Sequence, residues 1–270
     1  MACQSQCDGS MADGFLQLDA DVLEYGHIGT LSLYSAPADK GRFNRRCATP
    51  SPGMSKPQLL LASQSPRRSQ LLQLVGLPFE VSPAEVHEAP RAGESPVELV
   101  TRLSRAKVDG VTIVDRPGAL VIGCDTVVSL NGRMLGKPRD STDAAAMLRR
   151  LRGRSHLVHS ALTCLGPQGR TVTELVSTRV TMRSYSDAEI AAYVASGDPL
   201  DKAGGYAIQH TGFRPVDQVE GCYAGVMGLP LCHLARCLTG WGFRAAADVP
   251  AACQAHTGHF CTVYQEIVTL

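Results

Sequence analysis

The sequence contains little that favours binding to nucleic acid or to a membrane. Aromatic residues make up only 5% of the 270 residues, and the formal net charge is +1. A nucleic-acid-binding domain normally carries a basic stripe, so this composition disfavours that class. No apolar run approaches the roughly 18 residues that a membrane helix needs, and the N-terminus lacks a basic and apolar leader. We therefore expect a cytoplasmic protein that contacts neither nucleic acid nor membrane.

Paired cysteine motifs are also missing. The ten cysteines are dispersed, and no two of them form a C-x-x-C pair. This pattern favours reduced thiols over a disulfide framework or a zinc ribbon. Cys232, His233 and Cys237 lie near one another, but their spacing is poor for zinc, so we do not expect a zinc site there.

Composition divides the chain into three parts. Residues 1–55 are rich in Ser, Gly, Pro and Asp, which predicts a disordered N-terminal extension. Met54 directly precedes SKPQLLLAS, which raises the hypothesis that the functional polypeptide begins there. Strand-like and helix-like segments alternate over residues 56–240, which predicts one α/β domain. Residues 241–270 show weak periodicity and are predicted to form a C-terminal appendage.

Hydrophobic periodicity gives the expected elements of the central domain. The predicted strands are 59–62, 79–82, 119–130, 156–166, 173–183 and 206–209, with 156–166 and 173–183 forming a hairpin or meander. One predicted helix begins at Pro66, and the others span 96–108, 143–151, 186–197 and 229–238. The helix over 186–197 begins with a capping-box pattern, because Ser186 is followed three residues later by Glu189.

The first candidate site follows the strand 59–62. Ser65 offers an N-cap oxygen, and Pro66 is tolerated in the first turn of a helix. A helix start presents free N–H groups, so Arg67 and Arg68 beside it predict an anion site for a phosphate or carboxylate. The alternative is two solvated arginines on an ordinary turn.

The second candidate is an aspartate in the middle of an apolar strand. Asp125 lies between Ile122 and Val127 in the segment 119–130, where a carboxylate usually requires a partner or a metal. The alternative is an aspartate that caps a turn. Lys137 follows in a Gly-Lys-Pro turn, where its ammonium group can meet a phosphate, although a lone loop lysine is normally only solvated.

The third candidate is the segment DPLDKAGGYAIQ, residues 198–209. Asp201 and Lys202 precede two glycines whose missing side chains allow a ligand to approach the backbone. Gln209 offers both a donor and an acceptor, which suits recognition of a nucleobase. The alternative is a glycine turn with surface charges. Glu88 in PAEVHEAP and Lys107 near the end of the helix over 96–108 add further charges.

These motifs, taken together and in this order, resemble the Maf family of nucleoside triphosphate pyrophosphatases. The resemblance covers about residues 57–240 and implies a mixed, twisted sheet flanked by helices with a central cleft, as in inosine triphosphate pyrophosphatases. The matching segments are LLLASQSPRRSQLL, VHEAPRAGESPVELVTRLSRAKV, VIGCDTVVSLNGRMLGKPRD, MLRRLRGRSH, DPLDKAGGYAIQ and VMGLPL.

The resemblance implies hydrolysis of a nucleoside triphosphate to the monophosphate and pyrophosphate with a divalent metal cation, Mg²⁺ or Mn²⁺. Asp125 is then the proton acceptor, and Glu88 and Asp125 are the metal ligands. The chain looks like the dTTP/UTP-specific type because of its specificity positions, Arg67, Thr126 and Gln209. The implied phosphate- and substrate-binding residues are Ser65, Arg68, Lys107, Lys137, Asp201 and Lys202.

The chain also departs from the pattern of this family. Cys124 replaces the usual alanine before Asp125, His87 replaces an aspartate, and His210 replaces a glycine beside Gln209. In the segment GCYAGV, Cys222 and Gly225 replace the usual Asp and Asn. The carboxylate, lysines and arginines of the motifs remain, so we expect catalytic activity.

Other functions remain open from the sequence. The substrate alternatives are modified pyrimidine triphosphates such as 5-methyl-UTP or pseudo-UTP. A nucleotide-binding regulator of cell division or septum formation, with little catalysis, is the alternative from another class. A homodimer is expected only because dimers are common among soluble enzymes.

Overall fold

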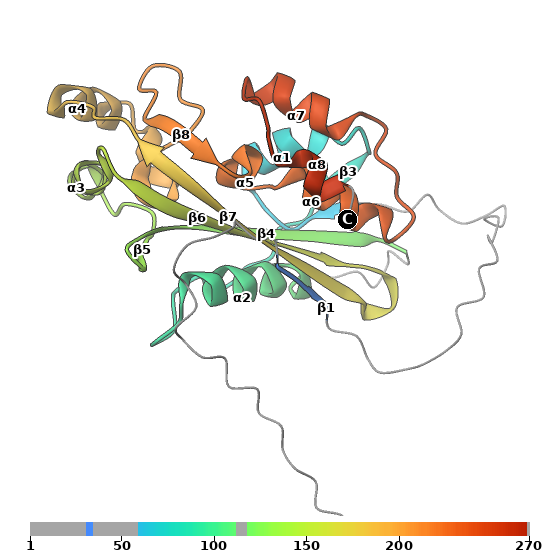
Figure 1. Cartoon of the computed structure of the whole chain (residues 1–270). Helices are drawn as coiled ribbons and strands as arrows, with labels where there is room; N and C mark the ends of the chain where they lie inside the picture. The colour runs from blue at the N-terminus through green and yellow to red at the C-terminus, as the bar shows by residue number, and fades with distance from the viewer. Residues whose placement is uncertain (1–30, 35–58, 112–117, 269–270) are drawn as a thin grey trace, which may run out of the picture.

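The computed structural model describes residues 31–34, 59–111 and 118–268 (Figure 1). The prediction of a disordered extension over residues 1–55, and the hypothesis about Met54, therefore lie mostly outside the described residues. Within that extension, Leu31–Tyr34 form strand β1, which pairs antiparallel with a strand of the central domain.

The domain is built on a mixed sheet of eight described strands. Its order is β1-β7-β6-β4-β2-β3, with β5 pairing β4 and β8 pairing β7. Strand β2 runs parallel to β3 and β4, and the remaining described pairs are antiparallel. The other strands are β2 (Leu59–Leu61), β3 (Phe79–Val81), β4 (Leu120–Leu130), β5 (Arg133–Leu135), β6 (Ser155–Leu165), β7 (Thr171–Met182) and β8 (Val216–Glu220).

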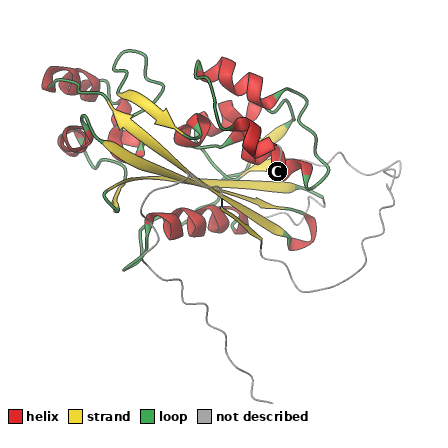
Figure 2. Ribbon diagram, in the orientation of Figure 1, coloured by secondary structure: helices red, strands yellow, loops and turns green. Residues whose placement is uncertain are grey.

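Helices cover both faces of this sheet, as Figure 2 shows. Among the described helices, α2 (Pro96–Asp109) alone packs against one face of β4 and β6, whereas α1, α5, α6, α7 and α8 gather on the opposite face (Figure 1). The other helices are α1 (Pro66–Gln73), α3 (Ser141–Leu151), α4 (Asp187–Ala195), α5 (Tyr223–Met227), α6 (Leu231–Thr239), α7 (Val249–Thr257) and α8 (Tyr264–Val268). The mixed α/β fold predicted from the sequence is confirmed.

The predicted elements are confirmed with one exception. The capping box of α4 is present, since Ser186 accepts from the backbone of Glu189 and Glu189 accepts from that of Ser186. The predicted strand over 206–209 is wrong, because those residues form coil and turn. They follow two short 3-10 helices, Asp198–Asp201 and Ala203–Gly205, in which both Gly204 and Gly205 have φ of +72°. Tyr206 is extended, but the backbone N–H of His210 donates to Ala207 O at 3.1 Å, and this turn ends the extended segment before a strand can form.

The segment 241–270 contains two helices that pack on the domain. Helices α7 and α8 both contact α6, and Val249 and Ile267 are buried. None of the described helices is long and apolar enough to cross a bilayer.

Strand β4 changes partners along one edge, and this change creates an opening. Leu120–Ile122 pair with β2, and Val128–Leu130 pair with β5, while β6 occupies the other edge from Val121 to Ser129. Among the described strands, none pairs with residues 123–127 on the first edge. Ligands of open α/β sheets commonly bind where neighbouring strands diverge, so this stretch of β4 is the expected place for a site.

Candidate active site

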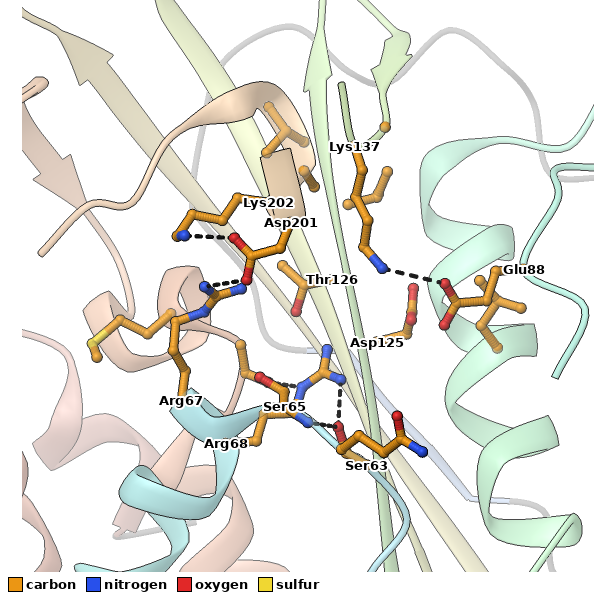
Figure 3. A pocket seen from close by; sticks show the side chains of 18 of the residues that line it. Ser63, Ser65, Arg67, Arg68, Glu88, Asp125, Thr126, Lys137, Asp201 and Lys202 are labelled. Atoms are coloured by element: carbon orange, nitrogen blue, oxygen red, sulfur yellow. Dashed lines mark hydrogen bonds and ion pairs between the residues drawn. The ribbon is translucent and has the colours of Figure 1, made fainter. Parts of the chain in front are cut away.

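A cleft of about 920 Å³ opens at the unpaired stretch of β4 (Figure 3). It lies among the turn after β2, the start of α1, helix α2 and the segment 198–209. All site residues predicted from the sequence line this cleft: Ser65, Arg67, Arg68, Glu88, Lys107, Asp125, Thr126, Lys137, Asp201, Lys202 and Gln209. The three candidate sites of the sequence, together with Glu88 and Lys107, therefore meet at one place.

A buried ion pair forms the centre of one side of the cleft. The Nζ of Lys107 on α2 donates to Asp125 Oδ1 at 2.6 Å and lies 2.9 Å from Glu88 Oε1. Lys107 and Asp125 are both buried, whereas the Glu88 side chain is about half exposed. One ammonium group thus holds two carboxylates from separate segments.

Glu88 stays ionised in this setting. Partial burial raises its pKa, but the hydrogen bond from Lys107 and the charges of Lys107, Lys137 and Arg68 outweigh that effect and lower the pKa below its ordinary value. Lys137 lies 3.8 Å from Glu88 Oε2, and its side chain is 63% exposed. Lys137 is therefore available to a phosphate, whereas Lys107 is already paired.

The start of α1 lines the cleft with Ser65, Arg67 and Arg68. Pro66 occupies the first helical position, and the Ser65 side chain makes no capping hydrogen bond. Arg68 is fixed from both sides, because its Nε donates to Gly228 O and its Nη1 to Ser63 Oγ, each at 3.0 Å. Ser63 was not predicted as a site residue, yet it orients this guanidinium.

The lysine of the third motif is saturated by its neighbours. Lys202 Nζ donates to the backbone oxygen of Asp198 at 2.5 Å, to Asp198 Oδ1 at 2.9 Å and to Asp201 Oδ1 at 2.6 Å. An ammonium group has three donors, so none remains for a ligand. Tyr193 on α4 also donates to Asp198 at 2.6 Å. The geometry therefore gives Lys202 a structural task, which is to hold Asp201 at the mouth of the cleft.

Asp201 in turn contacts Arg67. Arg67 Nη1 lies 3.3 Å from Asp201 Oδ2, as the dashed line in Figure 3 marks. Partial burial raises the pKa of Asp201, but the Lys202 hydrogen bond and the Arg67 charge lower it below its usual range. This arrangement keeps Arg67 directed along the rim of the cleft.

The other side of β4 carries neutral hydrogen bonds. Thr126 Oγ1 lies 2.7 Å from Ser160 Oγ on β6, and Ser160 Oγ donates to Gly225 O on α5 at 2.7 Å. Gln209 lines the same cleft and is half-buried. Ser160 carries no motif signal in the sequence, and only the β4–β6 register brings it to Thr126.

The departures from the family pattern near the site do not line the cleft. Cys124 is fully buried, and burial raises the pKa of its thiol to about 11. The imidazole of His210 accepts from the backbone N–H of Phe213 at 2.8 Å and packs against Tyr193. His87 is exposed outside the lining. Cys124, His87 and His210 therefore contribute no side chain to the lining of the cleft.

Cys222, another departure from the family pattern, has a structural position. Cys222 Sγ accepts from the backbone N–H of Gly225 at 3.3 Å, so the thiol takes the capping position at the start of α5. No group of three or more His, Cys, Asp or Glu side chains that could hold a metal occurs in the described part of the chain.

The cleft surrounds central carboxylates with cationic side chains, an arrangement that suits an anionic ligand. A family model described as "Maf-like protein" matches residues 58–241. The chain belongs to this Maf-like family.

Relatives within the family are similar over most of their length. The dTTP/UTP pyrophosphatase of Salinibacter ruber is 51% identical over 184 residues, covering 67% of this chain and 89% of the relative. That of Syntrophus aciditrophicus is 44% identical over 186 residues, covering 68% and 90%. A nucleoside-triphosphatase, or dITP/XTP pyrophosphatase, from Mycobacterium abscessus aligns with a TM-score of 0.30 and 18% identity, covering 47% of this chain and 75% of that one.

Proposed function

We propose that this protein hydrolyses dTTP and UTP to the nucleoside monophosphate and pyrophosphate. The observation that carries the proposal is Asp125, a buried carboxylate held by Lys107 in a cleft whose rim presents Arg67, Arg68 and Lys137. The names of the two relatives support the same substrate class.

The cationic rim suits a triphosphate. A triphosphate carries about four negative charges near neutral pH, so attack on it requires compensating positive groups. Arg68 is pre-oriented by two hydrogen bonds, and Lys137 is exposed and weakly paired. These two side chains, with Arg67 and the N-terminus of α1, bind and orient the phosphates.

Asp125 serves as the proton acceptor in this proposal. Lys107 occupies Oδ1, which leaves Oδ2 to orient a water molecule. The water oxygen attacks the α-phosphorus, the bond between that phosphorus and the oxygen bridging to the β-phosphorus breaks, and pyrophosphate leaves. The proton of the water passes to Asp125.

The residues present also fit a divalent metal. Glu88 and Asp125 bring carboxylate oxygens from two segments toward one cation, Lys107, so the local field already favours positive charge. Mg²⁺ is usually held by one or two carboxylates together with water and substrate phosphates, which matches two acidic residues rather than three. Glu88 and Asp125 would hold Mg²⁺ or Mn²⁺, which supplies charge neutralisation at the phosphate oxygens.

Base selection falls to the opposite side of β4 in this proposal. Thr126 and Gln209 line the cleft there together with apolar Ile208 and Met227. A few polar groups on an apolar wall are typical of sites that orient a ring-shaped ligand. Arg67 on the rim completes the three proposed specificity positions.

The test is pyrophosphate release with Mg²⁺ from the canonical triphosphates, 7-methyl-GTP, 5-methyl-UTP and pseudo-UTP. We expect kcat/KM to be highest for dTTP and UTP or their modified forms. The modified forms need direct comparison, because one methyl group is worth only about 1–3 kcal/mol of discrimination. A folded protein that binds UTP without releasing pyrophosphate would instead support the regulatory alternative.

A further inference from the structure

The hydrogen-bond directions around Thr126 are fixed by counting protons. Thr126 on β4 and Ser160 on β6 are direct cross-strand partners, with their hydroxyl oxygens 2.7 Å apart. Ser160 Oγ also lies 2.7 Å from the carbonyl oxygen of Gly225. A carbonyl can only accept, and a serine hydroxyl has a single hydrogen, so that hydrogen points to Gly225. Thr126 must therefore donate its own hydrogen to Ser160.

This direction leaves Thr126 with only lone pairs for a ligand. Thr126 is half-buried and lines the cleft, so its oxygen faces a bound molecule as a hydrogen-bond acceptor. Uracil and thymine carry a hydrogen on N3, whereas cytosine has a bare lone pair on N3. In one fixed orientation of the base, the N3–H of uracil or thymine can donate to Thr126 Oγ1. Cytosine in the same orientation would place the N3 lone pair against the lone pairs of Thr126 Oγ1, which is unfavourable.

We propose that Ser160 is a positioning residue that makes Thr126 an obligate acceptor and thereby selects the N3–H of uracil and thymine over cytosine. The inference deepens the proposed function and rests on it for the substrate class. Ser160 touches no ligand itself, because it is only 1% exposed. It acts through the proton of Thr126.

The buried surroundings fix the direction of the hydrogen bonds from Thr126 to Ser160 and from Ser160 to Gly225. The carbonyl of Gly225 belongs to α5, and the same oxygen accepts from the backbone N–H of Gly228 at 3.0 Å. Gly228 has φ of +117°, and its own carbonyl accepts from Arg68. Three elements, β4, β6 and α5, therefore lock the chain of hydroxyls. Rotation of Ser160 would break a buried hydrogen bond, which is unfavourable.

The apolar wall beside Thr126 increases the discrimination. Val226, Met227 and Ile208 line the cleft with it. A mismatched polar contact in such a setting cannot be repaired by solvent, so it costs more than it would in water. A site built around one hydrogen-bond direction rejects a ligand of the opposite direction more strongly than an apolar pocket rejects a missing methyl.

Equilibrium binding of UMP and CMP tests the inference independently of turnover, and kcat/KM for UTP and CTP tests it in the reaction. The wild-type protein should prefer the uracil nucleotide, and Ser160→Ala should reduce this preference about tenfold because the Thr126 hydroxyl becomes free to donate. Ser160→Thr retains the hydroxyl and should retain the preference. Ser129→Ala is the matched control, since Ser129 is a buried serine of β4 that bonds His159 outside the cleft.

The outcomes separate the two proposals. A UMP preference that depends on Ser160, without release of pyrophosphate from UTP, supports this inference and overturns the proposed function. Hydrolysis of UTP with a preference over CTP that Ser160→Ala leaves unchanged overturns this inference alone. Failure to bind UMP and to hydrolyse UTP overturns both.

A second measurement applies if Ser160→Ala does not fold. The wild-type protein is titrated with N3-methyl-UMP, in which a methyl group replaces the N3 hydrogen of the uracil nucleotide. The same titration of Thr126→Val, which lacks the acceptor oxygen, gauges the bulk of the methyl group. We expect N3-methyl-UMP to bind about tenfold more weakly than UMP. Equal affinity for UMP and N3-methyl-UMP overturns the inference.

Discussion

The two sides of β4 that meet in the cleft use different kinds of interaction. Asp125 faces α2 and belongs to a charged cluster with Lys107 and Glu88. Thr126, the next residue, faces α5 and belongs to a neutral relay with Ser160. In Figure 3 the carboxylate Glu88 and Lys137 lie at one side of the view, and Arg67, Asp201 and Lys202 lie at the other.

This difference teaches how one strand can serve two tasks. Charges act over several ångströms and tolerate small displacements, which suits the neutralisation of a phosphate chain. Neutral hydrogen bonds act only at short range and in one direction, which suits the choice between similar rings. Because side chains alternate along a strand, adjacent residues supply both without sharing space.

Replacement of Asp125 by Asn should have the largest effect on this contrast. The amide keeps the shape but cannot accept the proton, so we expect kcat for UTP to fall about a thousandfold. The preference for UMP over CMP should stay, because it belongs to the other side. Pyrophosphate release and nucleotide binding measure the two effects, and thermal unfolding checks the fold. Retention of more than about a tenth of kcat would remove Asp125 from the base role.

Replacement of Lys107 by Met should leave two adjacent carboxylates without their shared cation. We expect the free energy of unfolding at pH 7 to fall by about 3 kcal/mol, since Lys107 and Asp125 are both buried. Denaturant unfolding measures this loss. Lys137→Met is the matched control, because Lys137 is exposed and lies 3.8 Å from the same Glu88. Its loss should be well under about 1 kcal/mol, and equal losses would contradict the assignment.

Replacement of Lys107 by Met should also change the pH dependence of activity. The pKa of Glu88 is lowered in the folded protein, so its ionised form, and the stability it contributes, persist above the unfolded pKa and are lost only as pH falls through the lower folded value. Removing Lys107 should move the acid limb of kcat/KM to higher pH. A profile of kcat/KM between about pH 3 and 7 tests this direction, and an unmoved limb would exclude Glu88 as its origin.

Most of the helices and strands, and most residues that line the cleft, could be predicted from the sequence. The interactions that each of these residues makes could not. Asp125 stands out because a carboxylate inside an apolar strand is unusual. Ser160 does not, because it becomes relevant only through the register of β6 against β4. Lys202 resembles a ligand-binding lysine in sequence, yet Asp198 and Asp201 occupy all its donors. Registers and donor counts depend on tertiary contacts that motif spacing does not contain.

Replacement of Arg67 by Ala should have a smaller effect than the two charge changes. Arg67 is partly exposed and contacts Asp201 at 3.3 Å, so its loss should raise KM about tenfold or change the order of dTTP, UTP and CTP. Steady-state kinetics on the three triphosphates measures this. Arg149→Ala is the control, because Arg149 is exposed and pairs with Asp187 outside the cleft. Identical kinetics for wild type and Arg67→Ala would contradict the specificity role.

Replacement of Cys124 by Ala should have the smallest effect. The thiol is buried beside Asp125 but does not line the cleft, so kcat should change by less than about twofold. The lost packing should lower the free energy of unfolding by about 1 kcal/mol. Kinetics and denaturant unfolding of the same variant check both numbers. A large loss of activity with an intact fold would mean that the thiol influences Asp125 directly.

The long pairing of β4 with β6 determines which sequence changes the site can tolerate during evolution. A shift of one residue in this register would turn Asp125 toward α5 and Thr126 toward α2, and would exchange the positions of the proposed proton acceptor and the proposed specificity residue. The pairing extends from Val121 to Ser129, well beyond the stretch that faces the cleft. Substitutions along β4 and β6 can therefore accumulate without moving the site. A single inserted or deleted residue within the paired stretch before Asp125 would instead reverse the faces on which Asp125 and Thr126 lie.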